Sequence, residues 1–192
     1  MSGIVLPGFA EPVAGAQACF RAVLDAMARP GQVHEAGAGL TPPAPLVPAS
    51  AAVLLTLVDH DTPLWLDAAA GSAREWIAFH CGAPIVEDAA ACSFALALSW
   101  LDLGVLPAGS YEAPETSATL IVQVRSLGSG QRFRLEGPGL REPVVLAIDG
   151  LPSGFAEIWQ RNHALFPCGI DVVLCAGTRL AALPRSVTVR EA

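Results

Sequence analysis

The sequence predicts an α/β layered domain built around a mixed sheet. Three observations support this prediction. Segments with helical and strand-like hydrophobic spacing alternate along the chain, and residues 119–136 have the alternating pattern of an antiparallel hairpin. The segment Ile170–Cys175 is almost continuously apolar, which is typical of a central strand buried on both faces. We expect one domain, 1–192, with residues 1–12 as an N-terminal arm.

Four segments have the hydrophobic spacing of helices. The first places four large apolar side chains on one face of a 3.6-residue period, and a Pro-Gly pair ends it. These four side chains are Phe20, Val23, Leu24 and Met27. The second is apolar all round, which predicts a buried helix. The predicted helices are Ala16–Ala28, Ala51–Val58, Ser72–Cys81 and Ser153–Leu165.

Seven segments have the composition and length of strands. They are Thr62–Leu66, Pro84–Val86, Ser93–Ser99, Thr119–Arg125, Arg132–Glu136, Ile170–Cys175 and Ser186–Arg190. We expect the fourth and fifth to pair as an antiparallel hairpin across the turn Ser126–Gln131, because their apolar residues alternate and the turn contains glycine.

Composition excludes several classes of protein. The net charge is −7 and no arginine-rich run occurs, so the basic surface that nucleic-acid binding requires is missing. Prolines and polar residues interrupt every long apolar segment, so we expect no membrane span. The five cysteines are an odd number without a CxxC pair, which favours reduced thiols in the cytoplasm. The hydrophobic content of 53% predicts a large core or an apolar surface kept for a partner.

The chain contains no lysine, since all eleven basic residues are arginines. Pyridoxal-phosphate enzymes hold their cofactor through a lysine Schiff base, and P-loop nucleotidases and protein kinases need a lysine on the phosphates. These classes are therefore excluded, and we predict no cofactor.

The segment FPCGIDVVLC, residues 166–175, raises the question of a cysteine nucleophile. A reactive thiolate needs a base and a setting that lowers its pKa. His163 is the nearest histidine in the sequence, and nothing local activates Cys168, so we expect a thiol in an exposed turn. Asp171 lies one residue into the predicted strand, where a carboxylate would pair with backbone N–H groups or with an arginine such as Arg185, because an unpaired buried charge is costly.

The densest polar cluster is Asp59-His60-Asp61-Thr62, which we expect at a helix end and turn. One tripeptide cannot supply a full coordination sphere, and no second ligand group completes it, so no metal site is predicted. His80 is expected at the edge of the core. We predict no catalytic residue. The candidates for contact with a ligand or partner are Asp59, Asp61, Thr62, His80, Asp171 and Arg185.

Four stretches resemble the PhnH family, a subunit of the bacterial carbon–phosphorus lyase system. They are FRAVLDAMARPG (20–31), LLTLVDHDTPLWL (54–66), TLIVQVRSLGSGQRFRLEGPGL (119–140) and FPCGIDVVLCAGTRLAALPRSVTV (166–189). The patterns DxDTPxWL, FPxGID and LPR together are specific, and the resemblance covers nearly the whole chain. The family pattern fixes the residues around position 168 but not that position, which argues against Cys168 as a nucleophile.

The resemblance implies a three-layer sandwich with a mixed, mainly parallel sheet and one antiparallel hairpin, similar to the pyridoxal-phosphate transferases without their cofactor site. It implies a homodimer in isolation and an accessory role beside PhnG, PhnI and PhnJ in alkylphosphonate breakdown, with ATP or a phosphonate as candidate ligands. Two alternatives stay open. One is a stand-alone phosphonate or nucleotide hydrolase using Asp59, Asp61 and His80, and the other is a pure scaffold.

Overall fold

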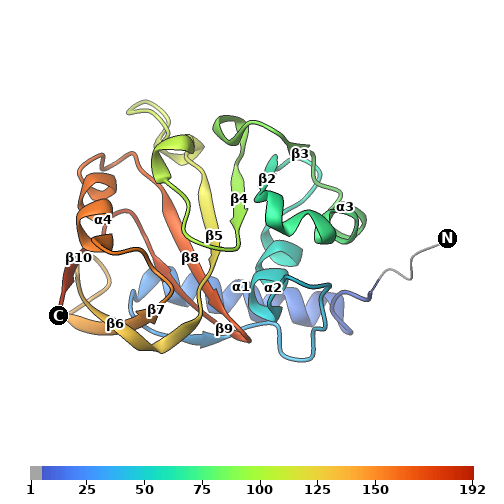
Figure 1. The fold of residues 1–192 in the computed structure, drawn as a ribbon, viewed down its shortest axis with the longest axis horizontal. Helices are drawn as coiled ribbons and strands as arrows, with labels where there is room; N and C mark the ends of the chain where they lie inside the picture. Colours follow the sequence, from blue (N-terminus) through green and yellow to red (C-terminus); the bar gives the residue numbers. More distant parts are fainter. Residues whose placement is uncertain (1–5) are drawn as a thin grey trace.

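A computed structural model describes residues 6–192, and its backbone forms two sheets and four α-helices over that range (Figure 1). The helices are α1 (Pro12–Ala28), α2 (Pro48–Leu57), α3 (Arg74–Cys81) and α4 (Phe155–His163). The larger sheet contains β1 (His34–Glu35), β2 (Leu64–Leu66), β3 (Ile85–Val86), β4 (Phe94–Ala97), β5 (Thr119–Gln123), β8 (Asp171–Ala176) and β9 (Arg179–Leu183). The smaller sheet contains β6 (Ser126–Glu136), β7 (Val144–Asp149) and β10 (Thr188–Glu191).

The larger sheet is mixed and mainly parallel, which confirms the predicted class. Its strand order is β1-β9-β8-β5-β4-β2-β3. The strands β3, β2, β4, β5 and β8 run parallel, and β9 and β1 complete one edge in antiparallel pairing. The apolar strand β8 lies between β5 and β9, and its residues Val172–Cys175 are fully buried. A strand buried on both faces needs a continuous apolar run, which is why this strand could be predicted from its sequence.

The predicted hairpin between residues 119–125 and 132–136 is wrong. Strand β5 pairs in parallel with β4 and β8, and the strand over 132–136 belongs to β6, which pairs with β7 and β10. Residues 126–131 form the start of β6, where the register shifts between Leu127 and Gln131, rather than a hairpin turn. An alternating pattern fits a hairpin strand, but Leu120, Ile121 and Val122 are all fully buried, as in a central parallel strand.

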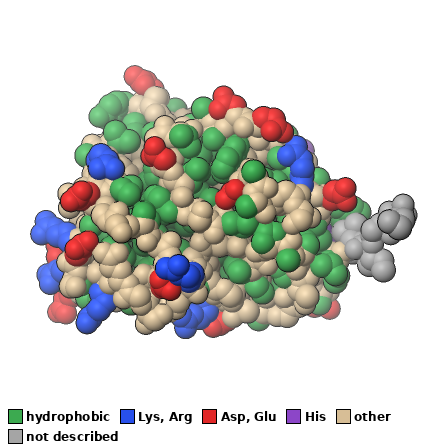
Figure 2. All heavy atoms as spheres, in the orientation of Figure 1, with side chains coloured by type: hydrophobic (Ala, Val, Ile, Leu, Met, Phe, Trp, Pro, Cys, Tyr) green, Lys and Arg blue, Asp and Glu red, His purple; other side chains and the backbone are tan. Residues whose placement is uncertain are grey.

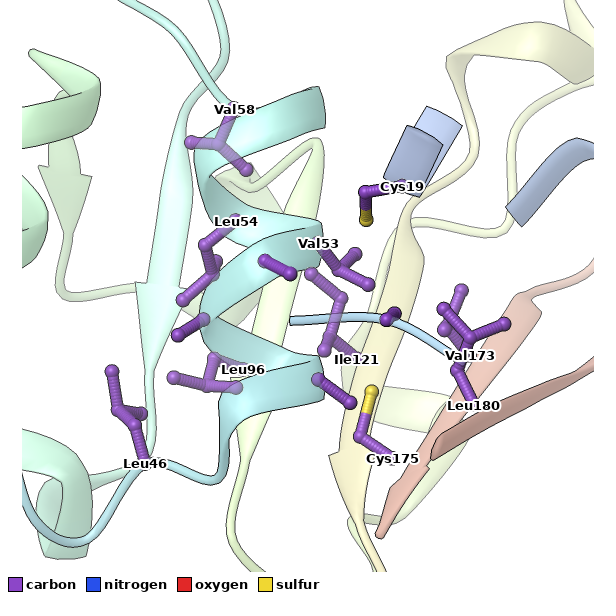
Figure 3. Close-up of a cluster of buried hydrophobic side chains, with 14 of the residues drawn as sticks. Cys19, Leu46, Val53, Leu54, Val58, Leu96, Ile121, Val173, Cys175 and Leu180 are labelled. Atoms are coloured by element: carbon purple, nitrogen blue, oxygen red, sulfur yellow. The ribbon is translucent and has the colours of Figure 1, made fainter. Parts of the chain in front are cut away.

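Two hydrophobic clusters lie on the two faces of the larger sheet. Helices α1, α2 and α3 supply one cluster, to which β5 contributes Ile121 and β8 contributes Val173 and Cys175 (Figure 3). Strands of the smaller sheet and α4 supply the other, to which β5 contributes Leu120 and β8 contributes Val172. The smaller antiparallel sheet and α4 therefore cover one face of the larger sheet, and the other three helices cover the opposite face.

Helix α1 buries only part of the predicted apolar face, because Val23 and Met27 pack into the core but Phe20 and Leu24 do not. The buried residues are Cys19, Ala22, Val23 and Ala26, whereas Phe20 and Leu24 are exposed. Both stripes have helical spacing, and the side with small residues lets α1 approach the neighbouring elements closely. The helix also begins at Pro12 rather than Ala16, because proline is well suited to a first helical turn. The first five residues of the predicted arm lie outside the described range.

Candidate functional site

The most extensively bonded charged pair among residues 6–192 joins Asp171 and Arg185 at the amino end of β8. The Asp171 carboxylate accepts the Arg185 backbone N–H at 2.7 Å and guanidinium N–H groups at 2.6 to 3.2 Å. The side chains are only 22% and 15% exposed, so water competes weakly for these bonds. The predicted pairing of Asp171 with Arg185 is thus confirmed.

This ion pair ties together segments that are distant in the sequence. Arg185 Nη1 also donates to the carbonyl oxygen of Pro114 at 2.9 Å, and a ring nitrogen of His163 lies 2.9 Å from the Arg185 carbonyl oxygen. The backbone N–H of Gly169 donates to Ala108 O at 2.8 Å. As a result, the loop between β4 and β5, the turn before β8 and the turn before β10 are held against one another.

The Asn162 side chain closes the turn before β8. It is buried at the end of α4, donates to the Ile170 carbonyl oxygen and accepts the Ile170 N–H. Both halves of its amide are satisfied, as a buried polar side chain requires. Sequence reasoning did not find this role.

Cys168 lies inside this turn, and the expectation of an exposed thiol is wrong. Only 7% of the residue is exposed, because the loop between β4 and β5 closes over the turn. His163, the nearest candidate base, uses Nδ1 for the Arg185 carbonyl. Within residues 6–192, no hydrogen bond joins the Cys168 thiol to a histidine. The geometry therefore favours Cys168 as a packing residue rather than a nucleophile.

A pocket of about 350 Å³ opens beside this turn, between the β4–β5 loop and α4. Its apolar lining comes from Leu103, Leu106, Ile158, Leu165 and Ile170. Asp102 and Arg161 also line it, and one Asp102 oxygen accepts the N–H of Gly104. The β4–β5 loop also exposes the large apolar side chains Val105 and Tyr111, and the turn after α4 exposes Leu165 and Phe166. We call these four residues and the pocket the apolar loop surface.

The Asp59–Thr62 segment forms the predicted turn after α2. Asp59 Oδ1 accepts the N–H of Asp61 at 3.0 Å, and the Thr62 hydroxyl accepts the N–H of Asp59 at 2.7 Å. His60 and Asp61 approach within 3.3 Å, but both side chains are about four-fifths exposed. These polar groups satisfy one another locally, as in a surface turn.

His80 is engaged elsewhere. On α3, Nε2 of His80 lies 2.9 Å from the Leu6 carbonyl oxygen, which also accepts the indole N–H of Trp76 at 2.7 Å. These two rings fasten the segment that precedes α1. Over the described range 6–192, no group of three or more His, Cys, Asp or Glu side chains is arranged to hold a metal ion.

A second polar site, which sequence reasoning missed, lies at the carboxyl end of β5. The Gln123 side-chain oxygen accepts the Val47 N–H at 2.7 Å and the Ser50 hydroxyl at 2.6 Å, and its amide donates to Pro45 O. This side chain thereby fixes the start of α2 on the sheet. The sequence signal is weak, because a glutamine after three apolar residues is equally typical of a strand that simply ends at the surface.

An opening of about 360 Å³ adjoins Gln123 and is lined by Ser99, Arg125 and Gly150, among others. Arg125 is already occupied there, because its guanidinium donates to both oxygens of Asp149 at 2.7 and 2.9 Å. These hydrogen bonds lower the pKa of Asp149. The Asp149 carboxylate thereby neutralises the Arg125 charge that an anionic ligand would need.

Burial also disfavours ionisation of four of the cysteine thiols. Burial raises the pKa of Cys81 to about 11 and raises the pKa values of Cys19, Cys92 and Cys175 as well. All five cysteines are free thiols. None of the helices found in residues 6–192 is both long and apolar enough to cross a membrane.

The fold and site define a mixed α/β protein whose most strongly bonded polar groups hold loops together. Comparison with known proteins identifies the family. Residues 7–190 match the family model described as bacterial phosphonate metabolism protein (PhnH). The chain therefore belongs to the PhnH family, and the resemblance found in the sequence is confirmed.

Two relatives are similar to the chain. The α-D-ribose 1-methylphosphonate 5-triphosphate synthase subunit PhnH of Rhizobium meliloti (strain 1021) is 43% identical over an alignment of 192 positions, which covers 96% of this chain and 95% of the relative. A protein of Stutzerimonas stutzeri named as a candidate C-P lyase subunit, HtxG, is 37% identical over 81 residues, or 42% of each chain.

Proposed function

We propose that this protein is an accessory subunit of an α-D-ribose 1-methylphosphonate 5-triphosphate synthase and takes part in alkylphosphonate catabolism. The observation that carries the proposal is the 43% identity to the R. meliloti subunit of that name across 96% of this chain. The partner subunits would be PhnG, PhnI and PhnJ, and the complex would displace adenine from ATP by the phosphonate.

The arrangement of polar groups supports an accessory role. Asp171 and Arg185 are used to join loops, and His80 and His163 are bonded to backbone carbonyls. The hydrolase alternative needs Asp59, Asp61 and His80 to act together, but Asp59 is bonded within its own turn and His80 is bonded to Leu6. The contribution of this chain would then come from its surfaces rather than from a reacting side chain.

The test is a chromatographic assay of adenine release from ATP and methylphosphonate. We expect no release by this chain alone, and release when it is added to PhnG, PhnI and PhnJ. Turnover by the chain alone that is abolished by Asp59→Asn or His80→Gln would overturn the proposal and favour the hydrolase. A partner assembly that is fully active without this chain would also contradict it.

Calorimetry separates an accessory ligand-binding subunit from a pure scaffold. ATP and methylphosphonate are titrated separately into the isolated chain and into the assembled complex. A saturable heat of ligand binding to the isolated chain would favour a ligand-binding subunit. A heat of binding that is measured only with the assembled complex would favour a scaffold.

The oligomeric state is part of the proposal. Val13, Phe20 and Leu24 form an exposed apolar stripe on α1, which favours a homodimer through this helix in isolation. Light scattering after size exclusion tests this, because Phe20→Asp should then yield a monomer.

Finer structural assignments are proposed on similar grounds. We propose that residues 1–192 form a single domain and that the arrangement of strands and helices is that of the pyridoxal-phosphate transferases without the cofactor site. The parallel core of the sheet and the absence of lysine support that assignment.

A cytoplasmic location is supported by the five free thiols. Cell fractionation with an antibody to the chain tests the location.

A further inference from the structure

The apolar loop surface has the properties of a recognition site. Its pocket is lined by five large aliphatic side chains, among them Leu165, and the two segments that form it also expose Val105, Tyr111 and Phe166. Exposed aromatic and aliphatic groups around an apolar depression are characteristic of the centre of a protein interface. Figure 2 shows many exposed hydrophobic side chains on one face of the molecule, with charged side chains of both signs scattered between them.

The segments that form this surface are fixed rather than loose. Arg185 anchors the β4–β5 loop at Pro114, Gly169 anchors it at Ala108, and Asn162 locks the turn before β8. A surface held in this way loses little conformational freedom when it binds, so more of the contact energy appears as affinity.

The two segments that form the pocket carry mostly negative charges. Asp102 lines it, Glu112 and Glu115 lie on the same loop, and Glu157 lies on α4, all with exposed side chains. Arg161 is the cation that lines the pocket, and no ion pair involves it within residues 6–192. These two segments thus carry four exposed carboxylates and one guanidinium, a balance that disfavours phosphonates and nucleotides and favours a basic group.

A second copy of this chain is a poor occupant for the same reason. Each copy has a net charge of −7, so a contact that includes the acidic groups of this surface would bring like charges together. The apolar stripe on α1, which we assign to self-association, is a separate surface carried by a different element.

We propose that the apolar loop surface docks a segment of another protein subunit, in which an apolar side chain enters the pocket and flanking lysines or arginines pair with the carboxylates of the β4–β5 loop and α4. This inference rests on the proposed function, since it assigns the surface through which the subunit joins its complex. The apolar anchor would supply most of the affinity, and the charges would speed association and select the partner.

The test compares matched variants for binding to the purified assembly of the other subunits by biolayer interferometry. Leu165→Asp and Val105→Asp place a charge on each of the two segments, and each should weaken binding at least about tenfold. Val145→Asp is the control, because Val145 on β7 is 47% exposed, as Leu165 is. Circular dichroism checks that each variant is folded. The two test variants lie on different segments, so that if one misfolds the other still tests the site.

The negative charge of the β4–β5 loop is tested separately. Glu112→Gln with Glu115→Gln should weaken binding about two- to fivefold at low salt, and the difference from wild type should shrink as salt is raised. Glu35→Gln with Glu142→Gln removes two exposed carboxylates elsewhere and should leave binding unchanged.

Hydrogen exchange on the wild-type complex gives an independent readout. Amides of residues 103–113 and 164–170 should become protected when the partners bind. Normal binding by both Leu165→Asp and Val105→Asp, without protection of these amides, would refute the docking site and leave the accessory role intact. Failure of the wild-type chain to bind any partner would instead refute the proposed function. A wild-type dimer that Leu165→Asp dissociates would assign the surface to self-association and overturn the inference.

Discussion

The Asp171–Arg185 pair allows a quantitative test of how burial sets the strength of an ion pair. In Asp171→Ala, the backbone N–H of Arg185 loses its acceptor and the guanidinium loses a two-pronged partner. A net hydrogen bond contributes about 1 kcal/mol and one to a charged group about 1.5–3 kcal/mol. Because the site is mostly but not fully buried, we expect a loss of about 2–4 kcal/mol in the free energy of unfolding.

Urea unfolding followed by tryptophan fluorescence and circular dichroism measures this loss. For a chain of this length, about 3 kcal/mol corresponds to a melting temperature lower by about 6–12 °C. Asp171→Asn keeps one oxygen for the Arg185 N–H and should fall between wild type and Asp171→Ala.

Asp149→Ala is the matched control, because Asp149 and Arg125 form the same two-pronged geometry on the surface. Arg125 is 75% exposed, so solvent screening and side-chain ordering offset most of the attraction, and the melting temperature should stay close to that of wild type. Equal losses in Asp171→Ala and Asp149→Ala, or a wild-type melting temperature in Asp171→Ala, would refute the reasoning.

Three other perturbations test the packing and the thiols. Gln123→Leu should cost about 1–3 kcal/mol in urea unfolding because Val47 N–H loses its acceptor, and an unchanged midpoint would show that water replaces the amide. Gly37→Ala should destabilise the chain far more than Gly177→Ala, since a Cβ at position 37 overlaps the Pro48 carbonyl and one at 177 meets nothing within 4 Å; similar melting temperatures would contradict this. At pH 8, iodoacetamide should label Cys81 slowly in the native chain and rapidly in guanidinium chloride, because burial raises its pKa to about 11 and little thiolate forms; fast native labelling located by mass spectrometry would exclude that burial.

The elements that could be predicted are those whose local sequence pattern is compatible with only one structure. The run Ile170–Cys175 is too short for an ordinary helix and too apolar for a surface strand, so its place inside the sheet was predictable. The partner of Asp171 was also predictable, because a charged group at the start of a buried strand needs compensation.

The errors arise where one sequence pattern is compatible with two different structures. The alternation of Leu120, Val122 and Val124 fits either an antiparallel strand or a buried parallel one, and only pairing with β4 and β8 decides between them. On α1, a stripe of large residues and a stripe of small ones have the same period, and close packing selects the small one. The pocket could not be predicted, because Leu103 and Ile158 come from segments more than fifty residues apart.

The positions of Asp171 and Arg185 explain how a motif that suggests chemistry can instead support a surface. The strand that Asp171 begins and the turn that Arg185 occupies meet at the amino end of the sheet, where Arg185 also reaches the β4–β5 loop through Pro114. Each nitrogen of the Arg185 guanidinium has a protein acceptor, because Nε and Nη2 donate to Asp171 and Nη1 donates to Pro114 O. The bonds are therefore used to hold the β4–β5 loop against the turn before β8, and these two segments carry Val105 and Leu165. A change at Asp171 would reach partner binding only by displacing that surface, whereas a change at Leu165 would act at the contact itself.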